Sequence, residues 1–231
     1  DWLPDGWGVL TFPCGSEYRG EFASGQFNNK GVLITAKGMQ YEGQWKEGHF
    51  EGQGTLKHAD GATYVGTFKR DIKDGLGVET WTDGTVYEGA FKNGDKEGKG
   101  KIRFPDGSSY EGDFKEDHFE GEGVYVWKDN RRYSGGWHNG LMEGFGVYVW
   151  SSGFIKKYEG EFKQGVKEGL WSEGQFVRWL EAPAKISLKE KERDTDKDEE
   201  YGTSIFSNPD AYTQAYKANS LEETLQQKLQ Q

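Results

Sequence analysis

The sequence predicts an all-β fold, an elongated single-layer antiparallel β-sheet solenoid of two-strand hairpins, followed by a C-terminal helical tail. One observation is a recurring Tyr-x-Gly-x-aromatic pattern, which begins at Tyr18, Tyr41, Tyr64, Tyr87, Tyr110, Tyr133 and Tyr158. The other is a Gly-x-Gly pattern, which begins at Gly6, Gly52, Gly75, Gly98, Gly121 and Gly144. Both recur at 23 residues or its multiples, and both gain two residues between Gly144 and Tyr158. A fixed period of this length indicates a repeat architecture.

The first strand of each hairpin is predicted from the Tyr-x-Gly-x-aromatic pattern. Residues i, i+2 and i+4 of a strand share a face, so Tyr87, Gly89 and Phe91 should lie together. We expect Gly89 to leave a gap in which a neighbouring aromatic ring can lie.

The second strand is predicted after each Gly-x-Gly. Positions two and four after its second glycine fall on one face and carry mostly large side chains. They are Leu10/Phe12, Leu33/Thr35, Leu56/His58, Glu79/Trp81, Ile102/Phe104, Tyr125/Trp127 and Tyr148/Trp150. The alternate positions are mostly Val, Thr, Lys or Arg, which suits the other face of a strand.

Two turns per repeat are predicted. The Asp-Gly pairs at 60–61, 83–84 and 106–107 favour two-residue type I′ hairpins, in which both central residues need positive φ. The other turn, with Gly48, Gly94, Gly140 or Gly165, is predicted to be looser. Consecutive hairpins should pair edge to edge, and the sheet should curve and leave a concave side that can receive another chain. Aromatic residues must then supply most of the core, consistent with 15% aromatic but only 33% hydrophobic residues.

These motifs at this period resemble the MORN (membrane occupation and recognition nexus) repeat, over about residues 6 to 171. We therefore assign residues 1–180 to an array of seven to eight repeats, with the first and last incomplete. The resemblance implies an adaptor at cytoskeletal or membrane-linked structures, including cilia, flagella and motor complexes. Departures from the pattern are interpreted as worn terminal repeats, and they are Asn29, Trp171, Arg19, Val65 and Ser134.

Composition limits the function classes. The net charge of −10 argues against nucleic acid, which calls for a basic stripe, and weakens the case for anionic membranes. The single Cys14 cannot form an internal disulfide, and no apolar run approaches the roughly 18 residues of a membrane span. With no visible signal peptide, we expect a cytoplasmic protein. Because the sequence opens at Asp1 in mid-repeat, we also expect a preceding N-terminal portion.

The C-terminal part changes in composition. Residues 174–180 are predicted to form a closing strand, residues 181–207 a charged linker, and residues 208–231 a helical tail. Pro209 suits a first helical position, and Ser220-Leu221-Glu222-Glu223 fits a capping box. The stripe of Leu221, Leu225 and Leu229 belongs either to a frayed helix or to a helix that docks on this sheet or on a partner.

The sequence offers no constellation for catalysis, a metal or a cofactor, and we predict a non-enzymatic protein. His49 and His118 are 69 residues apart, which is three periods and too far for one zinc ion. The glycines lack the lysine and the strand-to-helix context of a phosphate loop.

Charged residues form two columns, interpreted either as a soluble edge or as an acidic column that selects a basic partner. The acids are Glu51, Asp74, Glu97, Glu120, Glu143 and Glu168; the bases, five residues earlier and expected to neutralise them partly, are Lys46, Lys69, Lys92, Lys115, His138 and Lys163.

We predict a scaffold or adaptor that holds protein partners on the aromatic face, in a cytoskeletal assembly such as a ciliary or flagellar axoneme. The predicted partner-binding residues are Tyr41, Trp45, Tyr64, Phe68, Trp81, Tyr87, Phe91, Tyr110, Phe114, Trp127, Tyr133 and Trp137. The alternatives are a phospholipid-binding module and an accessory repeat region of a larger enzyme. Open sheet ends would also permit end-to-end homodimers.

Overall fold

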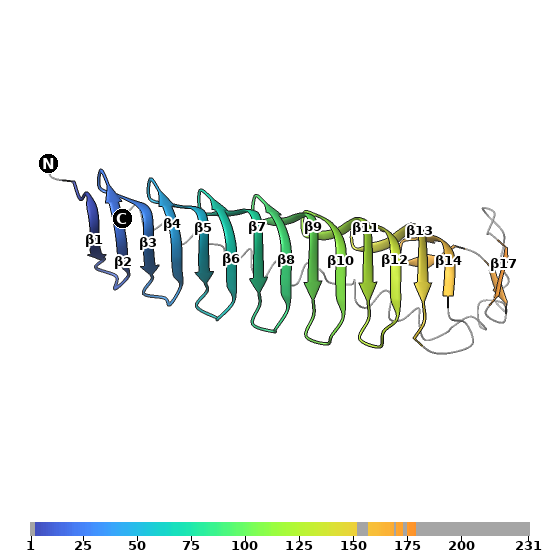
Figure 1. The fold of residues 1–231 in the computed structure, drawn as a ribbon. Coiled ribbons are helices and arrows are strands. Elements are labelled where there is room, and N and C mark those ends of the chain that lie inside the picture. The colour runs from blue at the N-terminus through green and yellow to red at the C-terminus, as the bar shows by residue number, and fades with distance from the viewer. Residues whose placement is uncertain (1–2, 152–156, 169, 173–174, 179–231) are drawn as a thin grey trace. The chain divides into compact units, whose positions relative to one another are not determined.

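The computed structural model describes residues 3–151, 157–168, 170–172 and 175–178 (Figure 1). The described part is all-β, as predicted, with strands that follow the chain order in antiparallel pairing. The predicted linker at 181–207, the helical tail at 208–231 and its Leu221, Leu225 and Leu229 stripe lie outside the described residues.

The first compact unit contains the described residues up to Pro105. Its strands each pair with the next in an antiparallel meander. They are β1 (Gly6–Thr11), β2 (Glu17–Ala23), β3 (Gln26–Ile34), β4 (Gln40–Lys46), β5 (His49–Lys57), β6 (Thr63–Lys69), β7 (Ile72–Thr80), β8 (Val86–Lys92) and β9 (Asp95–Arg103).

The second compact unit begins at Asp106 and repeats the same meander. Its strands are β10 (Ser109–Lys115), β11 (His118–Val126), β12 (Arg132–His138), β13 (Leu141–Val149), β14 (Lys157–Lys163) and β15 (Val166–Lys167). A separate two-stranded sheet follows, formed by β16 (Leu170–Ser172) and β17 (Gln175–Arg178). The predicted closing strand therefore forms, but in a sheet of its own.

A tyrosine over a pair of glycines organises each hairpin. Gly89 faces Gly100 across the strands, and a Cβ built on Gly100 would lie 2.5 Å from the Tyr87 hydroxyl oxygen. The register shifts between Gly89 and Phe91, where Ala90 alone lies opposite residues 97–99, so β9 carries a bulge of two extra residues. The Tyr87 hydroxyl donates to the Ala90 carbonyl oxygen at 2.9 Å, which satisfies an acceptor displaced by the bulge.

The same bond recurs at every repeat tyrosine, with O···O distances of 2.8 to 3.0 Å. The predicted gap at Gly89 is therefore correct, but its predicted occupant is wrong. The ring of the same repeat fills it, because the glycine pair leaves room directly beneath Tyr87.

The first glycine of Gly-x-Gly is required for its backbone conformation. Gly98 has φ +76°, in the left-handed region that glycine adopts without steric cost. Asn29 takes this position in an earlier repeat with φ +55°, and asparagine is among the few other residues that tolerate it. Asn29 is therefore a compatible substitution, not a sign of wear.

The two turns of each repeat have the opposite geometries to those predicted. Asn93 and Gly94 both have positive φ (+51° and +94°) in a two-residue loop between Lys92 and Asp95, which is the type I′ geometry. The turn predicted to be looser is therefore the tight one.

At the Asp-Gly turn only the glycine has positive φ, as at Gly61 (+102°). The Gly61 N–H donates to the His58 carbonyl oxygen (3.0 Å) and the His58 N–H to the Ala62 carbonyl oxygen (2.8 Å). This is a three-residue loop, a type I turn closed by a left-handed glycine. The Asp60 side chain accepts a hydrogen bond from the Ala62 N–H at 3.0 Å, which explains why aspartate stands at this turn position.

The core lies on the aromatic face of the sheet. Tyr64 contacts Phe68 of its own strand and Phe91 of the next repeat edge-to-face, with ring centroids 5.0 and 5.1 Å apart. Tyr41 contacts Trp45 and Phe68 in the same way, at 5.1 and 5.3 Å. Each tyrosine thus links two consecutive hairpins by a favourable aromatic geometry.

Candidate partner-binding face

The twelve predicted partner-binding residues all lie on the aromatic face, and the structure places them in its core. Their exposed fractions run from 0% at Tyr41 to 8% at Trp81. Their rings hold the sheet together, so surface for a partner must come from less buried side chains on the same face.

One row of side chains, which the sequence analysis missed, lies over the tyrosine rings nine residues after each tyrosine. The residue there is phenylalanine or lysine in six repeats and Met142 in the seventh, and only Phe50 and Met142 are buried. Phe27, Phe50 and Phe119 stack on Tyr18, Tyr41 and Tyr110 with centroids 3.7, 3.6 and 3.8 Å apart. Lys73, Lys96 and Lys167 place Nζ 5.1, 5.6 and 5.9 Å from the centroids of Tyr64, Tyr87 and Tyr158. The fixed offset from the tyrosine would have been the signal.

Strand β7 brings a charged cluster into this aromatic surface. Lys73 forms an ion pair with Glu79, and their side chains are only 19% and 5% exposed. The Lys73 ammonium also lies 5.6 Å from the centroid of Phe91, so aromatic rings contact it on two sides. Burial lowers the pKa of His58, and the nearby Lys73 ammonium lowers it further. The cluster places a largely buried ion pair among the aromatic rings of this repeat.

A second row immediately precedes the three-residue turns that end in glycine. Phe12, Thr35, His58 and Phe104 are half-buried, and Trp81 is the buried member in this unit. Lys96 lies with Nζ 5.1 Å from the centroid of Trp81, so the two rows meet there. This edge of the aromatic face offers rings and cations at the repeat period.

The second unit has an aromatic and cationic cluster of its own. The guanidinium of Arg131 lies 5.5 Å from the centroid of Trp127, and its Nη1 donates to the Tyr148 hydroxyl at 3.2 Å. Arg131 is also ion-paired to Asp129, at 2.8 Å. Lys167 lies 4.3 Å from the centroid of Trp150. Cations over aromatic rings are thus common to both units.

Burial raises the pKa of six repeat tyrosines, to about 12 at Tyr18 and Tyr158, and it also raises the pKa of Tyr41, Tyr64, Tyr110 and Tyr133. The neutral phenol is favoured in the folded state, so this contribution to stability is complete below the ordinary tyrosine pKa of 10.0. It is lost as the pH rises from there through the folded value. We therefore expect the free energy of unfolding to fall steeply above pH 10.

The measurement is a spectrophotometric tyrosinate titration of the folded chain, with unfolding followed in parallel by circular dichroism. Ionisation of most tyrosines near pH 10 without unfolding would contradict the buried positions. Titration of the chain in urea provides the control, since all tyrosines should then ionise near their ordinary pKa.

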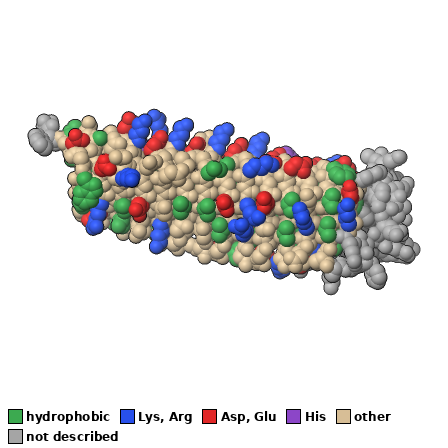
Figure 2. Space-filling model, viewed as in Figure 1, with side chains coloured by type: hydrophobic (Ala, Val, Ile, Leu, Met, Phe, Trp, Pro, Cys, Tyr) green, Lys and Arg blue, Asp and Glu red, His purple; other side chains and the backbone are tan. Residues whose placement is uncertain are grey.

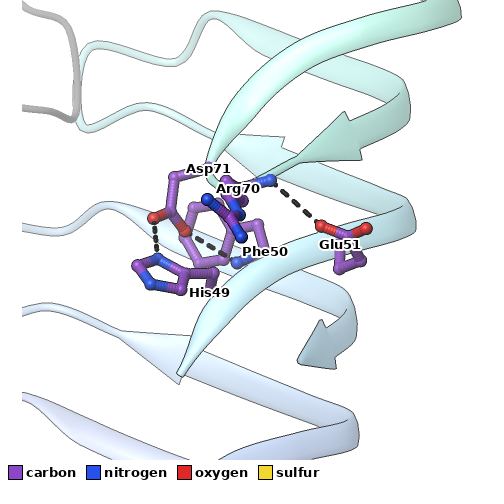
Figure 3. Close-up of polar contacts among 5 residues, drawn as sticks. All are labelled: His49, Phe50, Glu51, Arg70 and Asp71. Carbon is purple, nitrogen blue, oxygen red and sulfur yellow. Dashed lines mark hydrogen bonds and ion pairs between the residues drawn. The ribbon is translucent and has the colours of Figure 1, made fainter. Parts of the chain in front are cut away.

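The predicted acidic column serves the fold, a role that neither earlier interpretation included. Figure 3 shows the Arg70 N–H donating to Glu51 Oε2 (3.1 Å), while Asp71 accepts the Phe50 N–H at 2.7 Å and lies 2.6 Å from His49 Nδ1. The Asn139 and Gln164 N–H groups bind Glu120 and Glu143 in the same way. Each carboxylate holds the tight turn of the following repeat.

The charge columns also interact between repeats. The Nδ1 of His138 lies 3.0 Å from Glu120 Oε1 of the preceding repeat. Partial burial raises the pKa of Glu120, but hydrogen bonds from the Asn139 N–H and His138 outweigh it, and the net shift is downward. The columns therefore connect successive repeats.

The opposite, outer face carries both charged and apolar side chains. Over the first unit, Figure 2 shows Lys and Arg side chains along one edge and hydrophobic side chains in separate places on the visible face. Val65 lies on this face inside the array, on β6, so its interpretation as a worn terminal position is wrong.

Across the residues placed in the structure, no group of three His, Cys, Asp or Glu side chains could hold a metal ion. His118 Nδ1 contacts the Glu116 carbonyl oxygen at 2.7 Å. Within the same part of the chain, no helix is long and apolar enough to span a membrane.

Comparisons with known proteins identify the repeat. The model of the MORN repeat matches residues 18–40, 41–63, 64–86, 87–109, 110–130, 133–154 and 158–170. A comparison with curated protein sequences finds no significant match.

Among solved structures, the TCP domain of Drosophila melanogaster SAS-4 (dCPAP), in complex with a proline-rich motif of Ana2, is 15% identical. The match covers 68% of this chain and 86% of that one, with a TM-score of 0.40. The TCP10 domain of Danio rerio CPAP, with a STIL peptide, is 12% identical over 63% of this chain and 65% of that one, with a TM-score of 0.29. Staphylococcus aureus virginiamycin B lyase is 11% identical over 68% and 55%, with a TM-score of 0.18. At these TM-scores, no functional conclusion follows.

Proposed function

Because the chain belongs to the MORN repeat family, whose unit is a non-catalytic module, we propose that it is a scaffold that binds protein partners through its aromatic face. The observation that carries the proposal is the repetition of the same rows on the aromatic face of each unit. In the first unit, nine paired strands at about 4.8 Å spacing give a face roughly 38 Å across. Such a surface suits a partner segment better than a small substrate.

Partner contacts are assigned to the half-buried side chains that border the twelve core aromatics. These are Phe27, His58, Lys73, Lys96 and Phe104 in the first unit, and Phe119 and Trp150 in the second. Aromatic and basic side chains on a preordered surface lose little conformational entropy on binding and are frequent interface anchors. The twelve predicted rings would act by holding this surface in shape.

The family supports a role in a cytoskeletal assembly, and we propose that this is a cytoplasmic protein of a ciliary or flagellar axoneme. Leu221, Leu225 and Leu229 are proposed to give a second contact with the assembly or with this chain. End-to-end pairing of two sheets is proposed as a route to a homodimer, because unpaired strand edges invite strand addition.

The test is an affinity capture from ciliated-cell extract, read by mass spectrometry, with the full chain and a His58→Thr/Phe104→Thr variant. Thr35 occupies the equivalent position of another repeat, so the variant should fold. We expect the full chain to retain axonemal or motor proteins and the variant to lose most of them.

Val32→Thr on the outer face is the matched control, since Thr55 stands at the equivalent position, and it should behave like the unchanged chain. All three proteins would first be compared by thermal unfolding. Capture of no cytoskeletal protein, or equal capture by the aromatic-face variant, would count against the proposal.

A further inference from the structure

An apolar patch lies on the outer face of the first unit, opposite the aromatic face. Its centre is Val65 on β6 with Leu76 and Val78 on β7, which are 51%, 72% and 37% exposed. Val65 faces Val78 across the strands, and Leu76 faces Ala90 on β8. We call this the outer patch, and its surrounding members are Thr63, Thr67, Thr80, Val86 and Ala90.

The outer patch is a local departure from the repeat. The position of Val65 is occupied by Glu42 and Glu88 in the repeats on either side. The position of Leu76 is occupied by Gln53 and Lys99 in the repeats on either side, and by the exposed Trp7 and Phe145 in others. Val65 and Leu76 thus stand on adjacent strands where both neighbouring repeats carry polar or charged side chains. Contiguous exposed apolar surface of this kind marks an interaction site.

Basic residues flank the outer patch. The outward positions of β9 are Lys99, Lys101 and Arg103, and β5 contributes Lys57 on the other side. Register places Val78 opposite Glu88 and Glu88 opposite Lys101, so one acid lies between the apolar centre and the basic strand. The surroundings are therefore predominantly cationic, although the whole chain has a net charge of −10.

We propose that the outer patch binds an amphipathic helix of a partner protein, with an apolar stripe flanked by acidic residues. A helix is about 10 Å wide, close to two strand spacings of about 4.8 Å. Lying along β7, it would cover Leu76, Val78 and Val65. Its flanks would then reach over β9 and β5, where acidic side chains meet Arg103, Lys101 and Lys57. The acidic flank is expected mainly on the β9 side.

A protein helix fits better than a lipid surface. The outer patch is aliphatic and carries no tryptophan, tyrosine or phenylalanine, the residues that favour the membrane interface. Its apolar area extends over about three strands, which matches the contact stripe of a short helix. The proposal adds a second docking surface to the proposed function and does not depend on the aromatic face.

The probe is a synthetic helical peptide of about 14 residues, roughly 21 Å long, with leucines at helical spacing and glutamates beside them. Its binding to the full chain would be measured by fluorescence anisotropy. We expect the Val65→Glu/Leu76→Lys variant to bind at least about tenfold more weakly. Both new residues occur at equivalent positions of this chain, so folding should be retained. A Lys101→Glu/Arg103→Glu variant should also bind more weakly.

Three controls make the result decisive. Val9→Lys alters an exposed outer-face position on β1 and should leave peptide binding unchanged, as should His58→Thr/Phe104→Thr on the aromatic face. A peptide with lysines in place of the glutamates should not bind. Equal binding of both peptides, or undiminished binding to Val65→Glu/Leu76→Lys, would overturn the proposal. So would binding of phosphatidylserine-containing vesicles that this variant abolishes, because a membrane would then be the occupant.

Discussion

Replacing Gly100 by alanine is expected to destabilise the chain by about 3 kcal/mol, the upper end of the usual cost of overpacking. An alanine Cβ would lie 2.5 Å from the Tyr87 hydroxyl oxygen and 2.6 Å from Cε2 of its ring. The ring cannot withdraw, because it is fully buried and its hydroxyl is bonded to Ala90. Either the tyrosine leaves its place or the strands separate. Urea unfolding followed by tryptophan fluorescence would measure the loss.

The other glycine of the same motif provides the matched control. Gly98→Asn places a side chain at positive φ where Asn29 already stands, and its Cβ would meet only the Ala90 Cβ, at 3.8 Å. Its cost should be below about 1 kcal/mol. Equal effects of Gly98→Asn and Gly100→Ala would mean that backbone conformation, not the space under Tyr87, explains the motif.

Lys73→Phe alone is expected to cost about 3 kcal/mol, because it leaves the Glu79 carboxylate buried without its cation. The added phenylalanine should not compensate, although the same residue stacks well on tyrosine in other repeats. Chemical denaturation at neutral pH would give the change in the free energy of unfolding.

The double variant Lys73→Phe/Glu79→Leu should recover this loss. It recreates the pairs Phe27 with Leu33 and Phe50 with Leu56 of the two preceding repeats. A double-mutant cycle with Glu79→Leu isolates the coupling between the two residues. A double variant as unstable as the single one would show that β7 cannot accept the apolar arrangement.

The fold was predictable because its determinants are periodic and local. The alternation of residues around Tyr87, Gly89 and Phe91 predicted which side chains share a face of each strand. The 23-residue period predicted the order of the hairpins. The turn types were assigned wrongly because dipeptide preference alone does not count loop residues. Asp60 is present for its side-chain bond to the Ala62 N–H, which a preference for positive φ does not reveal.

The candidate site was harder to predict. Sequence periodicity showed which rings share a face but not how deeply they pack, so core residues were taken as contact residues. Lys73 and Glu79 were not recognised as a buried pair, because six residues separate them in the chain and only the path of β7 brings them together. The outer patch was visible only as an unexplained valine at position 65, since exposure depends on both neighbouring strands.

The hydrogen bonds between successive tight turns bear on how the length of such a repeat protein can evolve. The N–H of Gly94 binds the carbonyl oxygen of Lys73, and that of Gly48 binds the carbonyl oxygen of Phe27, each reaching back only one hairpin. These hydrogen bonds therefore connect only adjacent repeats, as expected for a protein whose stability is a sum of nearest-neighbour interactions. A gene encoding it can gain or lose whole units by duplication or deletion without disturbing distant contacts. Length becomes an evolvable property, and a specialised unit such as β6–β7 can be placed at a chosen distance from another.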